Sequence, residues 1–75
     1  MKFYVVEIST TAEGTAKAIA EKEDFNEARM LYHQILASMM ANTNVTEGIC
    51  TIIDSNARQL IDFTEKFVRE AEENL

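Results

Sequence analysis

Cysteine, glycine, proline and tryptophan are scarce or missing in this sequence. Its 75 residues include one cysteine, Cys50, two glycines, and no proline or tryptophan. A single cysteine excludes a disulfide within the chain, and one histidine without a CxxC pair does not support a structural zinc site. Two glycines cannot form a glycine-rich phosphate-binding loop. No apolar run approaches the roughly 20 residues that span a bilayer.

Positive charge is also scarce. Seven Lys and Arg residues stand against 13 Asp and Glu residues, which gives a formal net charge of −6. Nucleic-acid phosphates require Lys and Arg, so this balance disfavours nucleic-acid binding, whereas it suits solubility or a basic protein partner. The first residues lack the apolar core and cleavage site of a signal peptide. We therefore expect a cytoplasmic protein that binds neither nucleic acid nor a membrane.

The length of the chain predicts one small domain, residues 1–75. A domain of this size buries only about 60% of the surface that its unfolded chain exposes. Natural proteins this small usually add disulfides, a metal or a partner chain. Since the sequence indicates neither a disulfide nor a metal, we predict that the chain associates with itself as a homodimer or larger oligomer.

Four segments have the pattern of β-strands. Residues 3–9 are short, β-branched and aromatic, and residues 15–22 follow them after a turn that contains Gly14. The Lys and Glu residues of the second segment are typical of a sheet edge. Residues 48–54 and 58–62 predict a second hairpin, in whose turn Asn56 tolerates the left-handed conformation.

Two segments have helical signals. Asp24 is a good N-cap with Glu27 three residues later, and residues 25–41 predict the main helix. The side chains expected to pack on the sheet are Phe25, Ala28, Leu31, Tyr32, Ile35, Leu36 and Met39. A second Asp-Phe-x-Glu sequence at residues 62–65, with apolar residues at 63, 67, 71 and 75, predicts a short C-terminal helix over residues 63–75. The repeat indicates either a duplicated ββα unit or two ordinary helix starts.

These elements predict an α+β fold with the order ββαββα. The first and third strands are the most apolar, so we place them in the middle of a four-stranded antiparallel sheet of order 2-1-3-4. The main helix should cover one face of this sheet. The other face should be covered in part by the short C-terminal helix or by a second subunit.

The main helix has a second apolar strip on the side away from the predicted core. Its members are Met30, His33, Ala37, Met40 and Ala41. One interpretation is a soft-metal site at Met30, His33 and Met40, but such a site would need more soft ligands. Small and adaptable side chains are typical of a contact between helices, so we predict that this strip is an interface. Cys50 lies in an apolar strand and is interpreted as a small buried side chain, not a nucleophile.

The segments KFYVVEI, EARMLYHQILASMM and TIIDSNARQLI resemble small, largely uncharacterised proteins encoded by phages and mobile elements of Gram-positive bacteria. The resemblance implies a setting in which several proteins block host defence or toxin proteins by direct binding. It assigns no catalytic residue and no cofactor. The expected function is therefore a non-enzymatic, homo-oligomeric protein-binding module that inhibits or regulates a host protein, and the negative charge suits a basic host protein.

Two alternatives belong to other functional classes. An oligomer with a groove between subunits would bind a small molecule or nucleotide, and Lys17, Arg29 and Arg58 would contact its anionic group. A small enzyme with a site formed by the dimer would need His33 as its acid or base, because histidine alone has an unperturbed pKa near neutrality, about 6.5. The sequence predicts no cofactor for either.

Overall fold

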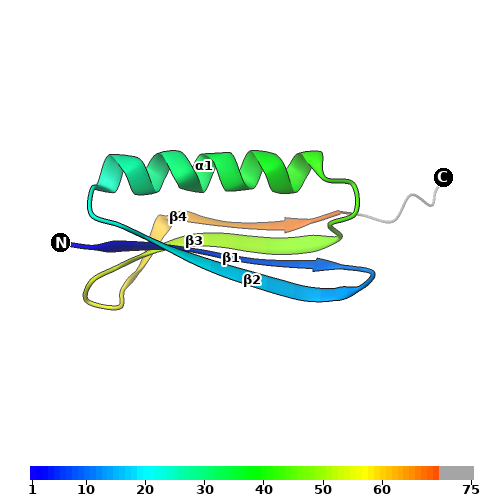
Figure 1. The fold of residues 1–75 in the computed structure, drawn as a ribbon, viewed down its shortest axis with the longest axis horizontal. Coiled ribbons are helices and arrows are strands. Elements are labelled where there is room, and N and C mark those ends of the chain that lie inside the picture. Colours follow the sequence, from blue (N-terminus) through cyan, green and yellow to red (C-terminus); the bar gives the residue numbers. More distant parts are fainter. Residues whose placement is uncertain (70–75) are drawn as a thin grey trace.

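The computed structural model describes residues 1–69, and these form a four-stranded antiparallel sheet with one helix across one face (Figure 1). The elements are β1 (Phe3–Thr11), β2 (Gly14–Lys22), α1 (Phe25–Ala41), β3 (Glu47–Asp54) and β4 (Gln59–Val68). The strand order is β2-β1-β3-β4, and every neighbouring pair is antiparallel. The predicted α+β fold and sheet order are confirmed.

Helix α1 begins and ends where its local sequence predicts. Asp24 is the N-cap, and its carboxylate accepts a hydrogen bond from the backbone N–H of Glu27 at 3.3 Å. The bond satisfies one of the N–H groups that a helix leaves unpaired in its first turn. At the other end Asn42 is the C-cap, and its N–H donates to the carbonyl of Ser38 at 3.0 Å.

The core lies between α1 and the two central strands. Ala28, Tyr32 and Leu36 on the helix are buried against Val5 of β1 and Cys50 of β3. At one end of this layer four aromatic rings meet with centroids 5.3 to 5.7 Å apart, in tilted or edge-to-face pairs, and they belong to Phe3, Phe25, Tyr32 and Phe63. Such geometries stabilise aromatic clusters beyond the area that they bury.

Gly48 allows α1 to approach the sheet closely near its C-terminal end. A Cβ atom at this position would lie 2.6 Å from the Sδ atom of Met39 and 2.9 Å from the carbonyl oxygen of Ile8. Both distances are shorter than real Cβ contacts. Glycine is therefore required here, because a Cβ atom would clash with the Ile8 backbone, which cannot move aside as the flexible end of Met39 can.

The predicted C-terminal helix is not shown, and its first half is wrong. Residues 63–68 continue β4, which pairs with β3 as far as Val68 opposite Glu47. Residues 70–75, the other part of the prediction, lie outside the described residues. Phe63 and Phe67 are four residues apart, a spacing that suits one face of a helix and equally one face of a strand. Pairing with β3 decides between the two, and Asp62 caps no helix.

Strand β4 contains a large bulge in its first half. The register steps from Thr51 opposite Thr64 to Ile53 opposite Gln59, so residues 60–63 all lie across from one residue of β3. The Thr64 hydroxyl stabilises the bulge by donating to the carbonyl of Leu60 at 2.8 Å. The Thr64 proton is used in that bond, so the Thr64 oxygen acts as the acceptor in its other two bonds. It accepts from the Thr51 hydroxyl at 2.7 Å and from the side-chain amide of Gln59 at 3.2 Å.

The β3–β4 turn differs from the prediction in its left-handed residue. Ala57, with φ 65°, takes this conformation instead of Asn56. The carboxylate of Asp54 accepts from the backbone N–H groups of Asn56 and Arg58, each at 2.9 Å. These bonds fix the turn one residue further along the chain than its asparagine suggests.

Candidate interaction surfaces

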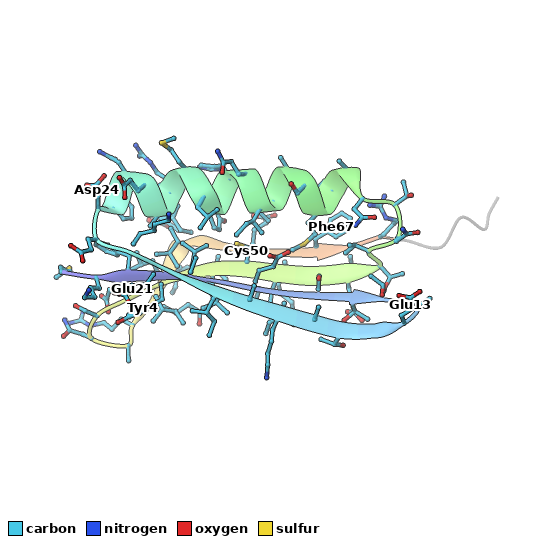
Figure 2. The ribbon with its side chains drawn as sticks, viewed as in Figure 1. Tyr4, Glu13, Glu21, Asp24, Cys50 and Phe67 are labelled. Atoms are coloured by element: carbon cyan, nitrogen blue, oxygen red, sulfur yellow. The ribbon has the colours of Figure 1, made fainter. Side chains whose placement is uncertain are left out.

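One face of the sheet is apolar and carries no helix in the described part of the chain (Figure 1). Side chains alternate along a strand, so the neighbours of the buried Val5, Cys50 and Ile52 point to the opposite side. The strand register brings six apolar side chains together there: Tyr4, Val6, Ile8, Ile19, Ile49 and Ile53. We call this surface the open face. Figure 2 shows Tyr4 on this side and Cys50 on the helix side.

The open face combines exposed and partly buried apolar side chains. Ile19 is 68% exposed and Ile8 is 38% exposed, while the four other apolar residues are partly buried by their neighbours. A shallow hollow of about 440 Å³ is lined by Tyr4, Val6, Ile19 and Ile53 together with the start of the β3–β4 turn. Exposed apolar clusters of this kind are typical of protein contact sites.

The charges of the open face are balanced, unlike those of the chain as a whole. Lys17 and Lys66 lie on it, as do Glu21 and Glu47, because each is opposite a residue of this face in the strand register. These four charges cancel locally, although the chain as a whole keeps its net charge of −6. The face is therefore suited to an apolar contact with polar residues at its margin.

The five residues predicted as an interface lie together on the outward side of α1. Met30 is 61% exposed and Met40 is 49% exposed, and His33, Ala37 and Ala41 are exposed as well. We call them the helix stripe. The opposite side of α1 packs on the sheet as predicted, with Ala28, Tyr32, Leu36 and Met39 buried. The helix stripe is thus a second surface, separated from the open face by the full thickness of the fold.

The three basic residues of the alternative ligand site are not brought together within one chain. Lys17 lies on β2 at the open face, Arg58 lies in the β3–β4 turn, and Arg29 lies on α1 on the other side of the sheet. The guanidinium of Arg29 donates to the side chain of Asn26 at 3.1 Å and lies 5.8 Å from the ring centroid of Phe25. These contacts give Arg29 a local structural role.

The two residues with nucleophilic or acid–base chemistry lie apart. Cys50 has no exposed surface, and burial, followed by the charge of Glu7, raises the pKa of its thiol to about 11. At neutral pH this thiol is protonated, which opposes a nucleophilic role. His33 is exposed on the helix stripe, with its ring centroid 5.1 Å from that of Tyr32. Among residues 1–69 no group of three His, Cys, Asp or Glu side chains is placed to hold a metal ion.

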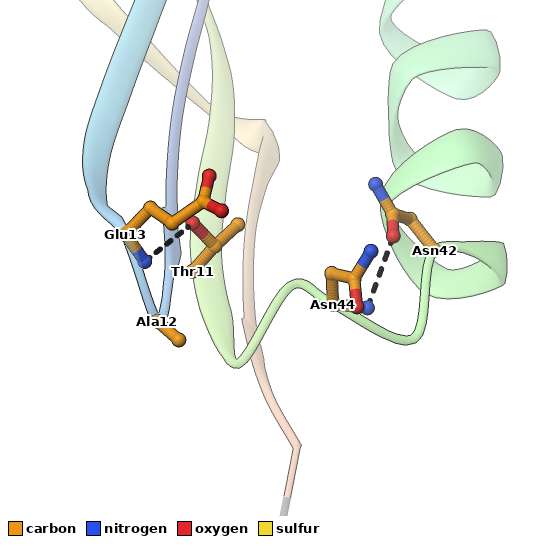
Figure 3. A pocket seen from close by; sticks show the side chains of 5 residues that line it. All are labelled: Thr11, Ala12, Glu13, Asn42 and Asn44. Carbon is orange, nitrogen blue, oxygen red and sulfur yellow. Dashed lines mark hydrogen bonds between the residues drawn. The ribbon is translucent and has the colours of Figure 1, made fainter.

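A small polar pocket lies at the end of the molecule, between the β1–β2 turn and the loop that follows α1 (Figure 3). Thr11, Ala12 and Glu13 line one side, and Asn42 and Asn44 line the other. The Thr11 hydroxyl accepts from the N–H of Glu13 at 3.2 Å, and the Asn42 side-chain oxygen accepts from the N–H of Asn44 at 3.0 Å. These hydrogen bonds shape the two turns, so the pocket is explained by local structure.

Part of the open face was readable in the sequence. The alternation of Tyr4, Val6 and Ile8 places them on one side of β1, and the open side of the sheet is predicted as a possible subunit contact. Ile19, Ile49 and Ile53 were missed as members of the same surface. The signal that could have found them is the same alternation, combined with the register of two hairpins.

In the described part of the chain, no helix is both long enough and apolar enough to cross a membrane. Comparisons with protein-family models, with curated proteins and with solved structures found no match to this chain.

Proposed function

We propose that this chain is a small, acidic, non-enzymatic protein-binding module that works as a homo-oligomer and inhibits or regulates a host protein. The observation that carries the proposal is the open face, an apolar surface on a sheet that α1 holds in shape from the other side. The resemblance to proteins of phages and mobile elements supports the host setting. The burial and raised pKa of Cys50 support a role without covalent chemistry.

The partner suited to this surface has an apolar centre and a basic margin. The open face supplies the apolar contact, and Glu47 and Asp54 at its rim would meet positive charge. Complementary charge at a rim raises the association rate and selects the partner, while the buried apolar centre supplies most of the affinity. The net charge of −6 favours the same kind of partner.

Two variants that each add one negative charge test which surface binds. Ile8→Glu changes the open face at a residue that is already 38% exposed, and Ala37→Glu changes the helix stripe. A host protein captured by the immobilised chain would be purified, and its dissociation constant measured by calorimetry. We expect Ile8→Glu to weaken binding at least about tenfold, because it places a charge in a buried contact, and Ala37→Glu to leave binding unchanged.

The opposite pattern, with binding lost in Ala37→Glu and kept in Ile8→Glu, would assign the contact to the helix stripe. If no purified host protein binds the wild-type chain, the proposed function is wrong. Circular dichroism of both variants provides the control for folding.

A further inference from the structure

Strand β2 forms an open edge of the sheet. It pairs with β1 over its full length without a register shift, and no other strand of the described chain pairs with it. It contains no proline and no bulge, and most of its side chains are exposed. Proteins usually protect such an edge, because its free backbone groups can pair with another strand. A regular, uncovered edge of nine residues is therefore a candidate site for pairing between chains.

One hydrogen bond identifies which backbone groups of β2 point outward. The carbonyl of Thr10 accepts from the N–H of Thr46 at 2.8 Å, so the backbone of Thr10 faces β3. Backbone groups alternate in direction along a strand, so the odd-numbered residues of β1 face β2. Their partners in β2 include Ala16, Ala18 and Ala20. The N–H and C=O groups that point away from β1 therefore belong to Thr15, Lys17, Ile19 and Glu21.

Opposite charges flank Ile19 at equal distances along β2. Lys17 lies two residues before it and Glu21 two residues after it, with an alanine between in each direction. We propose that β2 pairs with β2 of a second copy in antiparallel orientation, with Ile19 opposite Ile19. Lys17 of each copy is then opposite Glu21 of the other, and the outward backbone groups of all three residues are hydrogen-bonded. Opposite charges in directly opposed positions stabilise an antiparallel pair.

Other registers of the same two strands are less favourable. A shift that centres the pair on Lys17 sets two lysines opposite each other, and a shift that centres it on Glu21 sets two glutamates opposite each other, which destabilises both. Of the two intermediate registers, one places Lys17 opposite Ile19 and Glu21 opposite Thr15. The other places Glu21 opposite Ile19 and Lys17 opposite Glu23, which lies beyond the end of β2. Centring on Ile19 is the register that forms two charge pairs within β2, and it joins the two Ile19 side chains.

This pairing rests on the proposed function and enlarges its binding surface. The two sheets become one sheet of eight strands, with both copies of α1 on the same side. The two open faces then lie side by side on the other side, with the two Ile19 side chains in the middle. The second copy is therefore not a cover for the open face but an extension of it, which leaves that face free for a host protein.

A charge exchange tests the register. We expect Lys17→Glu alone and Glu21→Lys alone each to raise the dissociation constant of the dimer about tenfold, since each replaces two attractive pairs by two repulsive ones. The double variant restores both pairs with their signs exchanged, and its dissociation constant should return to within about threefold of the wild-type value. Analytical ultracentrifugation of the full chain measures these constants. Lys66→Glu, the same charge change on β4, should have no comparable effect.

Amide hydrogen exchange tests the pairing directly. In the dimer the N–H groups of Lys17, Ile19 and Glu21 should exchange slowly, and on dilution to the monomer they should exchange rapidly. The N–H groups of Ala18 and Ala20 bond to β1 and should be protected in both states. A dimer in which Lys17, Ile19 and Glu21 still exchange rapidly would overturn edge pairing while leaving the homo-oligomer of the proposed function intact. A strictly monomeric chain would overturn both, whereas binding at the open face is judged separately by Ile8→Glu.

Discussion

The two hairpins of this chain use their outer strands differently. In the first hairpin, β2 is straight, rich in alanine and almost entirely exposed. In the second, β4 is interrupted by a bulge over residues 60–63, and Phe63 lies in the aromatic cluster below α1. A bulge also disrupts an edge for pairing with another chain. One outer strand therefore completes the core, while the other is left available for pairing.

Arg69 strengthens the attachment of the second hairpin. Its guanidinium donates to the carbonyls of Met40 and Asn42 at 3.1 and 3.2 Å, and to Val45 at 3.0 Å, so the end of β4 is tied to the end of α1. The first hairpin has a weaker tie, in which the ammonium of Lys2 bonds to the carboxylates of Glu21 and Glu23 at 2.6 and 3.2 Å. These exposed ion pairs contribute little to stability.

The largest predicted difference between the hairpins is in the outer-strand side chains. Phe63→Ala should lower the free energy of unfolding by about 3 kcal/mol, because it opens a cavity beside Phe25 and Tyr32. Ile19→Ala should change it by less than about 0.5 kcal/mol in the monomer, since this side chain is 68% exposed. Urea unfolding at chain concentrations that keep the protein monomeric measures both. Equal effects would contradict the comparison.

Alkaline pH should lower the free energy of unfolding, because the buried Cys50 lies on β3 of the second hairpin. The pKa of Cys50 is raised from 9.0 to about 11 in the folded chain, so the unfolded chain loses this proton first. Stability is therefore complete below about pH 9 and falls between about pH 9 and pH 11, by about 3 kcal/mol in total. Urea unfolding from pH 8 to pH 11 measures the loss. The matched variant Cys50→Ala should be less stable at pH 8 and should lose this part of the pH dependence.

The hydroxyl of Thr64 provides a smaller test of the bulge. Thr64→Val removes the hydrogen bond to the carbonyl of Leu60 and leaves the buried Thr51 hydroxyl without its acceptor. The free energy of unfolding should fall by about 1 to 2 kcal/mol. The same substitution in the first hairpin, Thr15→Val, removes only an exposed contact with Thr10 and should have almost no effect. A similar loss in both variants would show that the bulge needs no hydroxyl.

The smallest effect concerns the ion pairs of Lys2. Its pKa is raised above 10.5, first by the hydrogen bond to Glu21 and then by that to Glu23. The stabilisation is present below pH 10.5 and is lost as the pH rises through the raised value. A titration of the Lys2 Cε resonance by NMR should show the raised pKa, and Glu21→Gln should lower it. An unchanged pKa in this variant would mean that the pair does not form in solution.

Much of this fold was predictable from local signals. Asp24 fixes the start of α1 through a bond to the nearby Glu27, and the strand order follows from the apolar character of β1 and β3. The outward position of Met30 and Ala37 follows from helical spacing. The error over residues 63–68 had a definite cause, because Phe63 and Phe67 suit both periodicities and the Asp-Phe-x-Glu repeat favoured the wrong one.

Interactions within a few residues specify the capped helix, the hairpin turn at Gly14 and the alternating faces of β1, so these can be read from the sequence alone. Long-range contacts decide that residues 63–68 extend the sheet, that Phe63 packs with Tyr32, and that Ile19, Ile49 and Ile53 join Tyr4 on one exposed face. Strand pairing and aromatic packing join residues far apart in the chain, so their outcome depends on the partner strand and not on local propensity.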